Sequence, residues 1–133
     1  MLEMKNETAR SFIIIDDDPV NNILCKRIIA AVFPDANIKT FTEPKTALAE
    51  IEQMRNIPGT AHTVILLDVS MPVLSGWDVL KLFDSFPDVI KQGSRIFLLS
   101  SSISRDDKSR AEQIDLVLGF IEKPLTMQQV REL

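Results

Sequence analysis

The sequence has few of the residues that stabilise secreted or membrane proteins. Its one cysteine, Cys25, cannot form an intramolecular disulfide, and there are one histidine, one tryptophan and no tyrosine. A lone cysteine in a helical stretch is typical of a reducing compartment and of a packing role. No apolar run approaches the ~20 residues of a membrane-spanning helix, and residues 1–10 lack the apolar core of a signal peptide. We therefore predict a cytoplasmic protein with no membrane association.

The chain contains no long cluster of like-charged residues. The 15 basic and 19 acidic residues give a net charge of −4, and no block of Lys or Arg stands out. This pattern argues against binding to nucleic acid or to an anionic membrane. The 133 residues, 45% of them hydrophobic, are enough for one domain with its own core. We predict a flexible polar arm over residues 1–10 and a single domain over residues 11–133.

Short apolar runs alternate with amphipathic segments along the chain. The apolar runs predict five strands, at residues 11–16, 38–41, 64–68, 95–100 and 117–121. Capping residues, prolines and apolar periodicity predict five helices: from Pro19 to near Phe33, from Pro44 to Met54, from Gly76 to about Phe86, from Arg105 to about Ile114, and a short one after Thr126. The predicted N-caps are Asp18, Ser75, Ser104 and Thr126. In the first helix, the spacing of Val20, Leu24 and Ile28 predicts the face that covers the sheet.

This alternation predicts an α/β fold with helices on both faces of a parallel sheet. A doubly wound arrangement requires the chain to reverse direction once, and the flavodoxin-like strand order 2-1-3-4-5 places the resulting crevice between strands one and three. Strand two, which mixes polar and apolar residues, then lies at an edge. Ligands of such sheets bind at the carboxyl ends of the strands.

Acidic residues follow both strands that border this crevice. Asp16 and Asp17 end the first strand and Asp68 ends the third, while Ser100 and Lys123 end the fourth and fifth. Three carboxylates in one place need a cation or protons to offset their charge, and oxygen ligands alone favour Mg²⁺. An aspartate is also able to accept a phosphoryl group as an acyl phosphate. Because Asp68 stands alone, we predict that it is the acceptor and that the Asp16-Asp17 pair binds the metal.

These motifs resemble the response-regulator receiver domains of two-component signalling, the CheY-like family. The resemblance runs from about Ser11 to Leu133. It rests on the acidic pair in Ile15-Asp16-Asp17-Asp18-Pro19, on Asp68 in Asp-Val-Ser-Met-Pro with Gly76 behind it, on Ser100 after two leucines, and on Lys123-Pro124. Each motif alone is weak evidence. Together, in this order and at these strand ends, they are specific.

The resemblance implies a phosphorylation-dependent switch and not a conventional turnover enzyme. Asp68 would accept a phosphoryl group from a phosphohistidine on a sensor histidine kinase or a histidine phosphotransfer protein, and the domain would assist its own phosphorylation and dephosphorylation. Mg²⁺ would be bound by Asp16, Asp17, Asp68 and the backbone carbonyl of Ser70, with Asp16 acting largely through water.

The resemblance also implies a route from the phosphate to an output partner. Ser100 would move toward the phosphate, Phe120 would turn inward, and Lys123 would hold a phosphate oxygen. Pro124 would follow a cis peptide bond. The output partner, which is unknown, would bind the face made by the helix from Arg105, the strand at 117–121 and the helix after Thr126. That last helix is only about two turns long, so we expect either an abbreviated or a truncated receiver domain.

Two other functions remain open at this point. One is a receiver-like docking module that works without phosphorylation, although the complete set of acids, hydroxyl and lysine argues against it. The other is a phosphatase of the haloacid-dehalogenase type, because Asp16-Asp17-Asp18 also resembles its pair of aspartates flanking one residue. No second acidic pair follows Lys123 in this sequence, which ranks the phosphatase hypothesis lowest.

Overall fold

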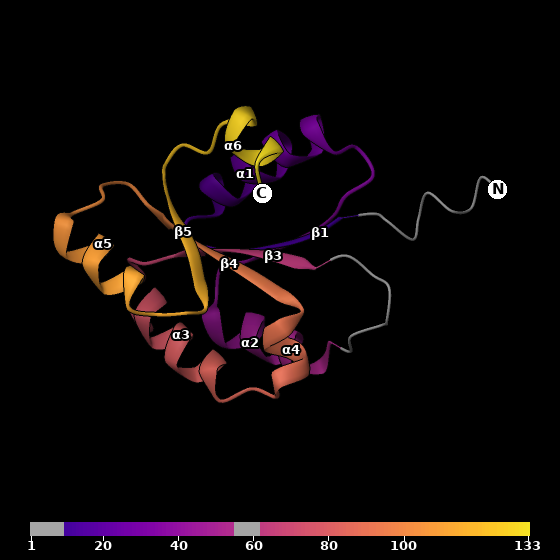
Figure 1. The fold of residues 1–133 in the computed structure, drawn as a ribbon. Coiled ribbons are helices and arrows are strands. Elements are labelled where there is room, and N and C mark those ends of the chain that lie inside the picture. Colours follow the sequence, from indigo (N-terminus) through magenta and orange to yellow (C-terminus); the bar gives the residue numbers. More distant parts are fainter. Residues whose placement is uncertain (1–9, 55–61) are drawn as a thin grey trace.

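A five-stranded parallel sheet lies between helices in the computed structural model, which describes residues 10–54 and 62–133 (Figure 1). Its strands are β1 (Ser11–Ile15), β2 (Asn37–Phe41), β3 (Thr63–Asp68), β4 (Ser94–Ser100) and β5 (Val117–Glu122). They lie in the order β2-β1-β3-β4-β5, and every pairing is parallel. The predicted fold class and strand order are confirmed.

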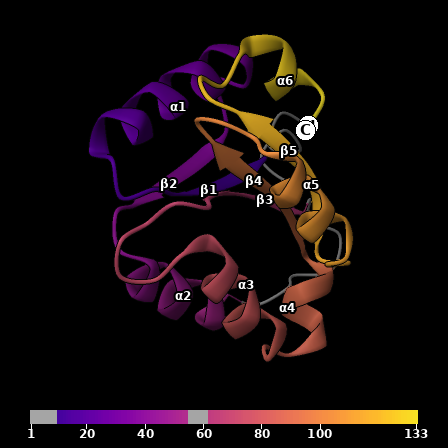
Figure 2. The same ribbon diagram turned by 90° about the vertical axis from the view of Figure 1, so that its left-hand side faces the viewer.

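The helices cover both faces of this sheet. Helices α1 (Pro19–Val32) and α6 (Met127–Arg131) pack against each other on one face (Figure 2). Helices α2 (Pro44–Gln53), α3 (Gly76–Asp84) and α4 (Asp88–Gln92) lie on the opposite face, and α5 (Arg105–Glu112) lies beside β5. No helix within residues 10–54 and 62–133 is long and apolar enough to cross a membrane.

The central strands are apolar throughout because both of their faces are covered. All six residues of β3 are buried, and the side chains alternate between two core clusters. Ile65 and Leu67 join the cluster under α2 and α3, whereas Val64 and Leu66 join the cluster under α1 and α6. Continuous apolar runs are expected for strands buried on both faces of a parallel sheet.

Several helices begin at the capping residues that the sequence predicts. Each of these side chains accepts a hydrogen bond from a backbone N–H in the first turn, which satisfies a donor that has no partner within the helix. The capping residues are Asp18, Ser75, Ser104 and Thr126. Ser75 and Thr126 form complete capping boxes, with Asp78 and Gln129 respectively. These short-range signals lie beside the loops that form the carboxyl edge of the sheet.

The predicted buried face of α1 is wrong at its first two positions but right at Ile28, which is partly buried and packs against the core. Val20 and Leu24 are exposed, whereas Asn21, Asn22, Cys25 and Ile29 are buried. The helix is therefore rotated by about one residue from the orientation that its apolar periodicity indicated. The reason is that the two asparagines make buried hydrogen bonds near the end of β1, so polar residues take part of the inner face. Cys25 has the packing role that its position predicted.

Two further differences concern the chain between β3 and β5. Helix α4 was not predicted, because its five residues are too few to show a helical period. The helix follows Pro87 and buries Ile90. Helices α3 and α5 end at Asp84 and Glu112, two residues before the predicted ends. The arm predicted at residues 1–10 lies outside the described residues except for Arg10, whose guanidinium lies 4.3 Å from the centre of the Phe33 ring.

Candidate functional site

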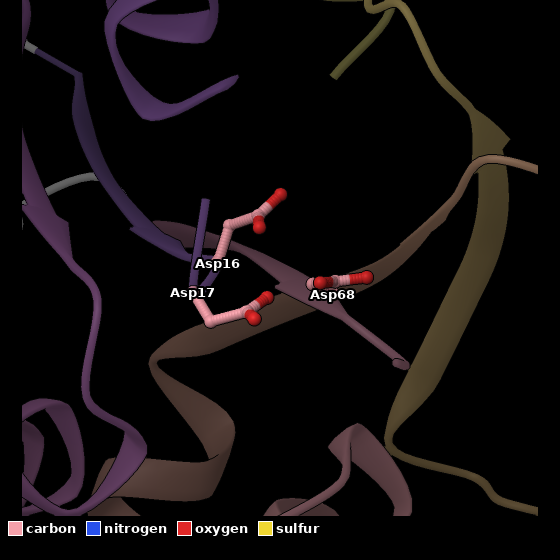
Figure 3. A group of neighbouring side chains, drawn as sticks. All are labelled: Asp16, Asp17 and Asp68. Atoms are coloured by element: carbon pink, nitrogen blue, oxygen red, sulfur yellow. The ribbon is translucent and has the colours of Figure 1, made fainter. Parts of the chain in front are cut away.

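Three aspartates gather at the carboxyl edge of the sheet (Figure 3). Asp16 and Asp17 directly follow β1, and Asp68 is the last residue of the neighbouring strand β3. One carboxylate oxygen from each of the three lies within 4.8 Å of the others. Ser100 ends β4 and Lys123 follows β5, so both come to the same edge. Tertiary structure thus brings together residues that are up to 107 positions apart, from Asp16 to Lys123.

The carboxylate of Asp16 is fully enclosed by protein hydrogen-bond donors. Its side chain has no exposed surface. Oδ2 accepts a hydrogen bond of 2.7 Å from the Asn21 amide and lies 2.7 Å from Nζ of Lys123. Oδ1 accepts a hydrogen bond of 2.9 Å from the backbone N–H of Asp18. A buried carboxylate needs such partners, and here both oxygens have one.

Asp68 has fewer favourable contacts than Asp16. The residue is 3% exposed, and its Oδ1 accepts a hydrogen bond of 3.2 Å from the backbone N–H of Ser70. Nζ of Lys123 lies 3.5 Å from the same oxygen. Burial, together with the nearby charge of Asp16, raises the pKa of the Asp68 carboxyl from 3.8 to about 6. The site therefore holds this carboxylate in its charged form at a cost in free energy, which a nearby cation would offset.

Lys123 links the two buried carboxylates. Burial alone would lower the pKa of its ammonium group, but contacts with Asp16 and Asp68 raise the pKa overall. Its backbone N–H donates a hydrogen bond of 2.8 Å to the carbonyl of Ser100, which joins the ends of β4 and β5. The peptide bond between Lys123 and Pro124 is cis. Lys123 is thus charged and held toward the centre of the cluster.

The hydroxyl of Ser100 is bonded within its own loop. It donates a hydrogen bond of 2.6 Å to the backbone carbonyl of Ser102 and accepts one of 3.2 Å from the Ser102 backbone N–H. Ser100 is buried, whereas the neighbouring Ser101 is exposed. Any contact between Ser100 and a group on Asp68 therefore requires the hydroxyl to leave the Ser102 carbonyl.

Phe120 lies on β5, opposite Leu98 of β4. The ring is partly buried and packs against the core cluster under α2 and α3. It also lines a hollow of about 320 Å³ between α5 and β5, together with Lys108, Ala111 and Glu112. Phe120 therefore has space on its outer side.

Gly76 supports the strand end that bears Asp68. A side-chain Cβ at this position would lie 2.6 Å from the carbonyl oxygen of Asp68 and 2.8 Å from Cα of Val69. The Gly76 backbone N–H donates a hydrogen bond of 3.1 Å to the Val69 carbonyl. The start of α3 therefore approaches β3 so closely that only glycine fits.

Comparison with known proteins identifies the family. The model of the response regulator receiver domain matches residues 12–133. The chain belongs to the response regulator receiver domain family. A two component response regulator from Cytophaga hutchinsonii is 30% identical, with a TM-score of 0.83 over 94% of this chain and 93% of that one. A receiver protein from Dyadobacter fermentans DSM 18053 is 25% identical, with a TM-score of 0.84 over 93% and 94% of the two chains.

The receiver domain corresponds to part of a longer protein in one curated relative. Stress response regulator protein 1 of Lodderomyces elongisporus is 25% identical over 126 residues, which make up 93% of this chain and 32% of that protein. The chain thus spans about a third of the length of this relative. Receiver domains are signalling domains of two-component systems and not conventional enzymes, which agrees with the class predicted from the sequence.

The donor set of this receiver domain fits Mg²⁺. The three carboxylates supply only oxygen ligands, as a hard divalent ion prefers. One ammonium group, that of Lys123, balances part of their charge. Asp17 and Ser70 are exposed at the rim of the site, so an ion held by them would be able to keep bound water. The residues present are therefore compatible with the metal that the sequence predicts.

Asn21 and Asn22 lie beside the site but were not among the predicted site residues. Asn21 donates to the Asp16 carboxylate, and Asn22 donates to the backbone carbonyls of Asp16 and Phe41. A signal was present, because two polar residues follow directly after the start of a helix that must cover a sheet. It was overlooked because the apolar residues on either side, Val20 and Leu24, form a helical period of their own.

Proposed function

We propose that this receiver domain is a phosphorylation-dependent switch in which Asp68 accepts a phosphoryl group from a phosphohistidine. The donor is a sensor histidine kinase or a histidine phosphotransfer protein. The supporting observation is the setting of the Asp68 carboxylate, which is buried at a strand end within reach of Lys123 and of two further aspartates. An oxygen of Asp68 attacks phosphorus as the bond from phosphorus to the imidazole nitrogen breaks, and the donor retains the imidazole.

Mg²⁺ is proposed to bind Asp17, Asp68 and the backbone carbonyl of Ser70 directly. Asp16 is proposed to act through water, because both of its oxygens already accept hydrogen bonds from the protein. When bound, the ion neutralises phosphoryl oxygens during transfer. In this proposal, the exposed Asp17 is a direct ligand of the metal, and the buried Asp16 remains the ion-pair partner of Lys123.

Lys123 and Ser100 are proposed to contact the phosphoryl group after transfer. The ammonium of Lys123, 3.5 Å from Asp68, needs only a small movement to pair with a phosphoryl oxygen. The Ser100 hydroxyl exchanges its bond to the Ser102 carbonyl for a charge-assisted bond to the phosphoryl group, which is the stronger of the two. Phosphorylation therefore favours a second arrangement of this loop by differential binding.

The movement of Ser100 is proposed to reach the output face through Phe120. Ser100 and Leu98 lie on β4, and Leu98 pairs with Phe120 on β5. When the loop after β4 moves toward the phosphate, Phe120 turns inward and the hollow beside α5 changes shape. The proposed output surface is formed by α5, β5 and α6. Its exposed Leu118 lies on β5 at an irregularity in the pairing with β4.

Helix α1 supplies an apolar surface next to the site. Val20, Ile23 and Leu24 are 61%, 53% and 49% exposed and lie on the first two turns of the helix that begins beside Asp16 and Asp17. A phosphodonor that reaches Asp68 has to approach this edge of the sheet. We propose that these three residues contact the phosphodonor protein, which also accounts for apolar residues on the outer face of α1.

The structure favours phosphotransfer to Asp68 over the phosphatase hypothesis. A haloacid-dehalogenase-type mechanism requires the first aspartate after β1 as nucleophile. Asp16 has no exposed surface, and its oxygens accept hydrogen bonds from Asn21 and Asp18. A carboxylate held in this way is a poor nucleophile. The docking-module hypothesis remains a second candidate, and binding to a partner that is unchanged in Asp68→Asn would support it.

Intact mass spectrometry tests the proposed function. The native chain is incubated with Mg²⁺ and a small phosphodonor, in parallel with Asp68→Asn and with an EDTA control. We expect a single phosphoryl adduct in the native chain that is absent from both controls. A phosphoryl adduct of equal yield in Asp68→Asn would overturn the assignment of the acceptor. No adduct, together with no Mg²⁺-dependent binding of beryllofluoride, would overturn the switch and favour docking.

A further inference from the structure

Two consecutive asparagines are buried at the start of α1. Asn21 and Asn22 are each less than a tenth exposed. A buried amide is costly unless it is hydrogen-bonded, so each of these side chains requires a structural or functional partner. The two amides have different partners, although they are adjacent in sequence.

The stronger partner of Asn21 belongs to the site, and a second, weaker one is Sγ of Cys25 at 3.6 Å. Nδ2 of Asn21 donates a hydrogen bond of 2.7 Å to Oδ2 of Asp16, the same oxygen that lies 2.7 Å from Nζ of Lys123. The partners of Asn22 belong to the backbone. Its Nδ2 lies 3.0 Å from the Asp16 carbonyl and 3.3 Å from the Phe41 carbonyl, at the ends of β1 and β2. Asn21 therefore contacts a charged group of the site, whereas Asn22 joins two strand ends.

We propose that Asn21 is a positioning residue that sets the affinity of the site for Mg²⁺ through Asp16. This inference rests on the proposed function. The backbone N–H of Asp18 binds one oxygen of Asp16, and Asn21 binds the other, so the plane of the carboxylate is held from both sides. In this orientation, the negative charge of Asp16 is fixed near Asp17 and Asp68 while Oδ2 faces Lys123.

Loss of the Asn21 amide leaves Lys123 as the one side-chain partner of Asp16 Oδ2 among the described residues. The carboxylate then rotates more freely and follows the ammonium group, so the charge of Asp16 is no longer held where it attracts the ion. Loss of a hydrogen bond that orients an acidic group of a metal site commonly weakens metal affinity by about 10-fold or more. We therefore expect about a tenfold weaker affinity for Mg²⁺ when this amide is removed.

Calorimetric titration of Mg²⁺ into matched variants tests the proposal. Asn21→Leu and Asn22→Leu both replace a buried amide with an aliphatic group of similar size. We expect the dissociation constant for Mg²⁺ to rise about tenfold in Asn21→Leu and to change less than about twofold in Asn22→Leu. Asn21→Ser, which also removes the amide, is the second variant if Asn21→Leu does not fold. Equal weakening in both asparagine variants would show a merely structural role and overturn the proposal.

A double-mutant cycle asks whether Asn21 acts through Asp16. In an Asp16→Asn background, adding Asn21→Leu should leave the affinity for Mg²⁺ unchanged within about twofold, because the charge that Asn21 orients is gone. A further tenfold loss in that background would contradict the proposal. If the native protein and Asp68→Asn bind Mg²⁺ with the same affinity, the proposed function itself is overturned. Weakening in Asp68→Asn but not in Asn21→Leu would overturn only the role of Asn21.

Discussion

The ammonium nitrogen of Lys123 lies 2.7 Å from Oδ2 of Asp16, a carboxylate with no exposed surface. The distance from the same nitrogen to Oδ1 of Asp68 is 3.5 Å. Lys123 is thus the stabilising partner of one aspartate and lies within reach of the other. This relationship connects the stability of the fold to the chemistry of the site, and it predicts opposite effects for two substitutions.

Substitution of Lys123 should destabilise the protein. Lys123→Met removes the cation and leaves the buried charge of Asp16 without its ion partner, which we expect to lower the free energy of unfolding by about 3 kcal/mol. Lys91→Met is the matched control, because Lys91 is similarly exposed but pairs with the exposed carboxylates of Asp84 and Asp88. We expect that variant to lose about 1 kcal/mol or less. Urea denaturation measures both, and equal losses would contradict the role of burial.

Substitution of Asp68 should stabilise the metal-free protein near neutral pH. The pKa of Asp68 is about 6 in the folded protein, above its usual 3.8. Between about pH 4 and 6 the folded state therefore binds more protons than the unfolded state, and the free energy of unfolding falls as the pH rises. A shift of this size corresponds to about 3 kcal/mol.

The measurement compares Asp68→Asn with the native chain by urea denaturation in EDTA at several pH values. We expect Asp68→Asn to be more stable by about 2–3 kcal/mol at pH 8, with the difference shrinking toward pH 4. A difference that is independent of pH would count against this account. Added Mg²⁺ should raise the stability of the native chain more than that of Asp68→Asn, since the ion binds the carboxylate.

Gly76 and Gly119 should respond differently to the same small change. In Gly76→Ala the new methyl group meets the backbone of Asp68 and Val69 at 2.6 and 2.8 Å, so the strand end or α3 has to move. We expect a loss of about 1–3 kcal/mol in the free energy of unfolding and slower phosphorylation by a small phosphodonor. In Gly119→Ala the nearest atom is Cδ2 of the Phe97 ring at 3.3 Å, which is able to shift. Equal phosphorylation rates in the two variants would contradict the supporting role of Gly76.

Substitution of the exposed apolar residues of α1 should slow phosphorylation by protein phosphodonors but not by small phosphodonors. Leu24→Glu places a charge in the proposed contact, and we expect about a tenfold slower transfer from a phosphohistidine protein. Phosphorylation by a small phosphodonor should remain at the native rate, because Leu24 is outside the site. Leu118→Glu is the matched control on the proposed output face, where Leu118 is 54% exposed. If phosphotransfer from the protein is slower in Leu118→Glu than in Leu24→Glu, the donor binds the proposed output face and not α1, which contradicts the proposed contact.

Residues at the strand ends were predictable because their placement depends on local pattern and on topology. The apolar runs of the first, third and fourth strands each end in a polar residue, and the carboxyl ends of parallel strands meet at one edge. Asp16, Asp68 and Ser100 therefore reach the same edge once the strand order is known. The caps of α1 and α3 were equally predictable, since a side chain and a backbone N–H two or three residues away suffice to form them.

The fold class, the strand order and the set of residues at the carboxyl edge are predictable from the amino-acid sequence, because they follow from hydrophobic periodicity and chain connectivity. Tertiary structure decided the orientation of α1, the hydrogen bonds of Asn21 and Ser100, and the raised pKa of Asp68. Each of these depends on distances of a few ångströms between segments that are remote in sequence, and on burial that only the assembled core creates. The apolar period of α1 indicated the wrong face at Val20 and Leu24 because it contained no information about the buried Asp16, to which Asn21 donates a hydrogen bond.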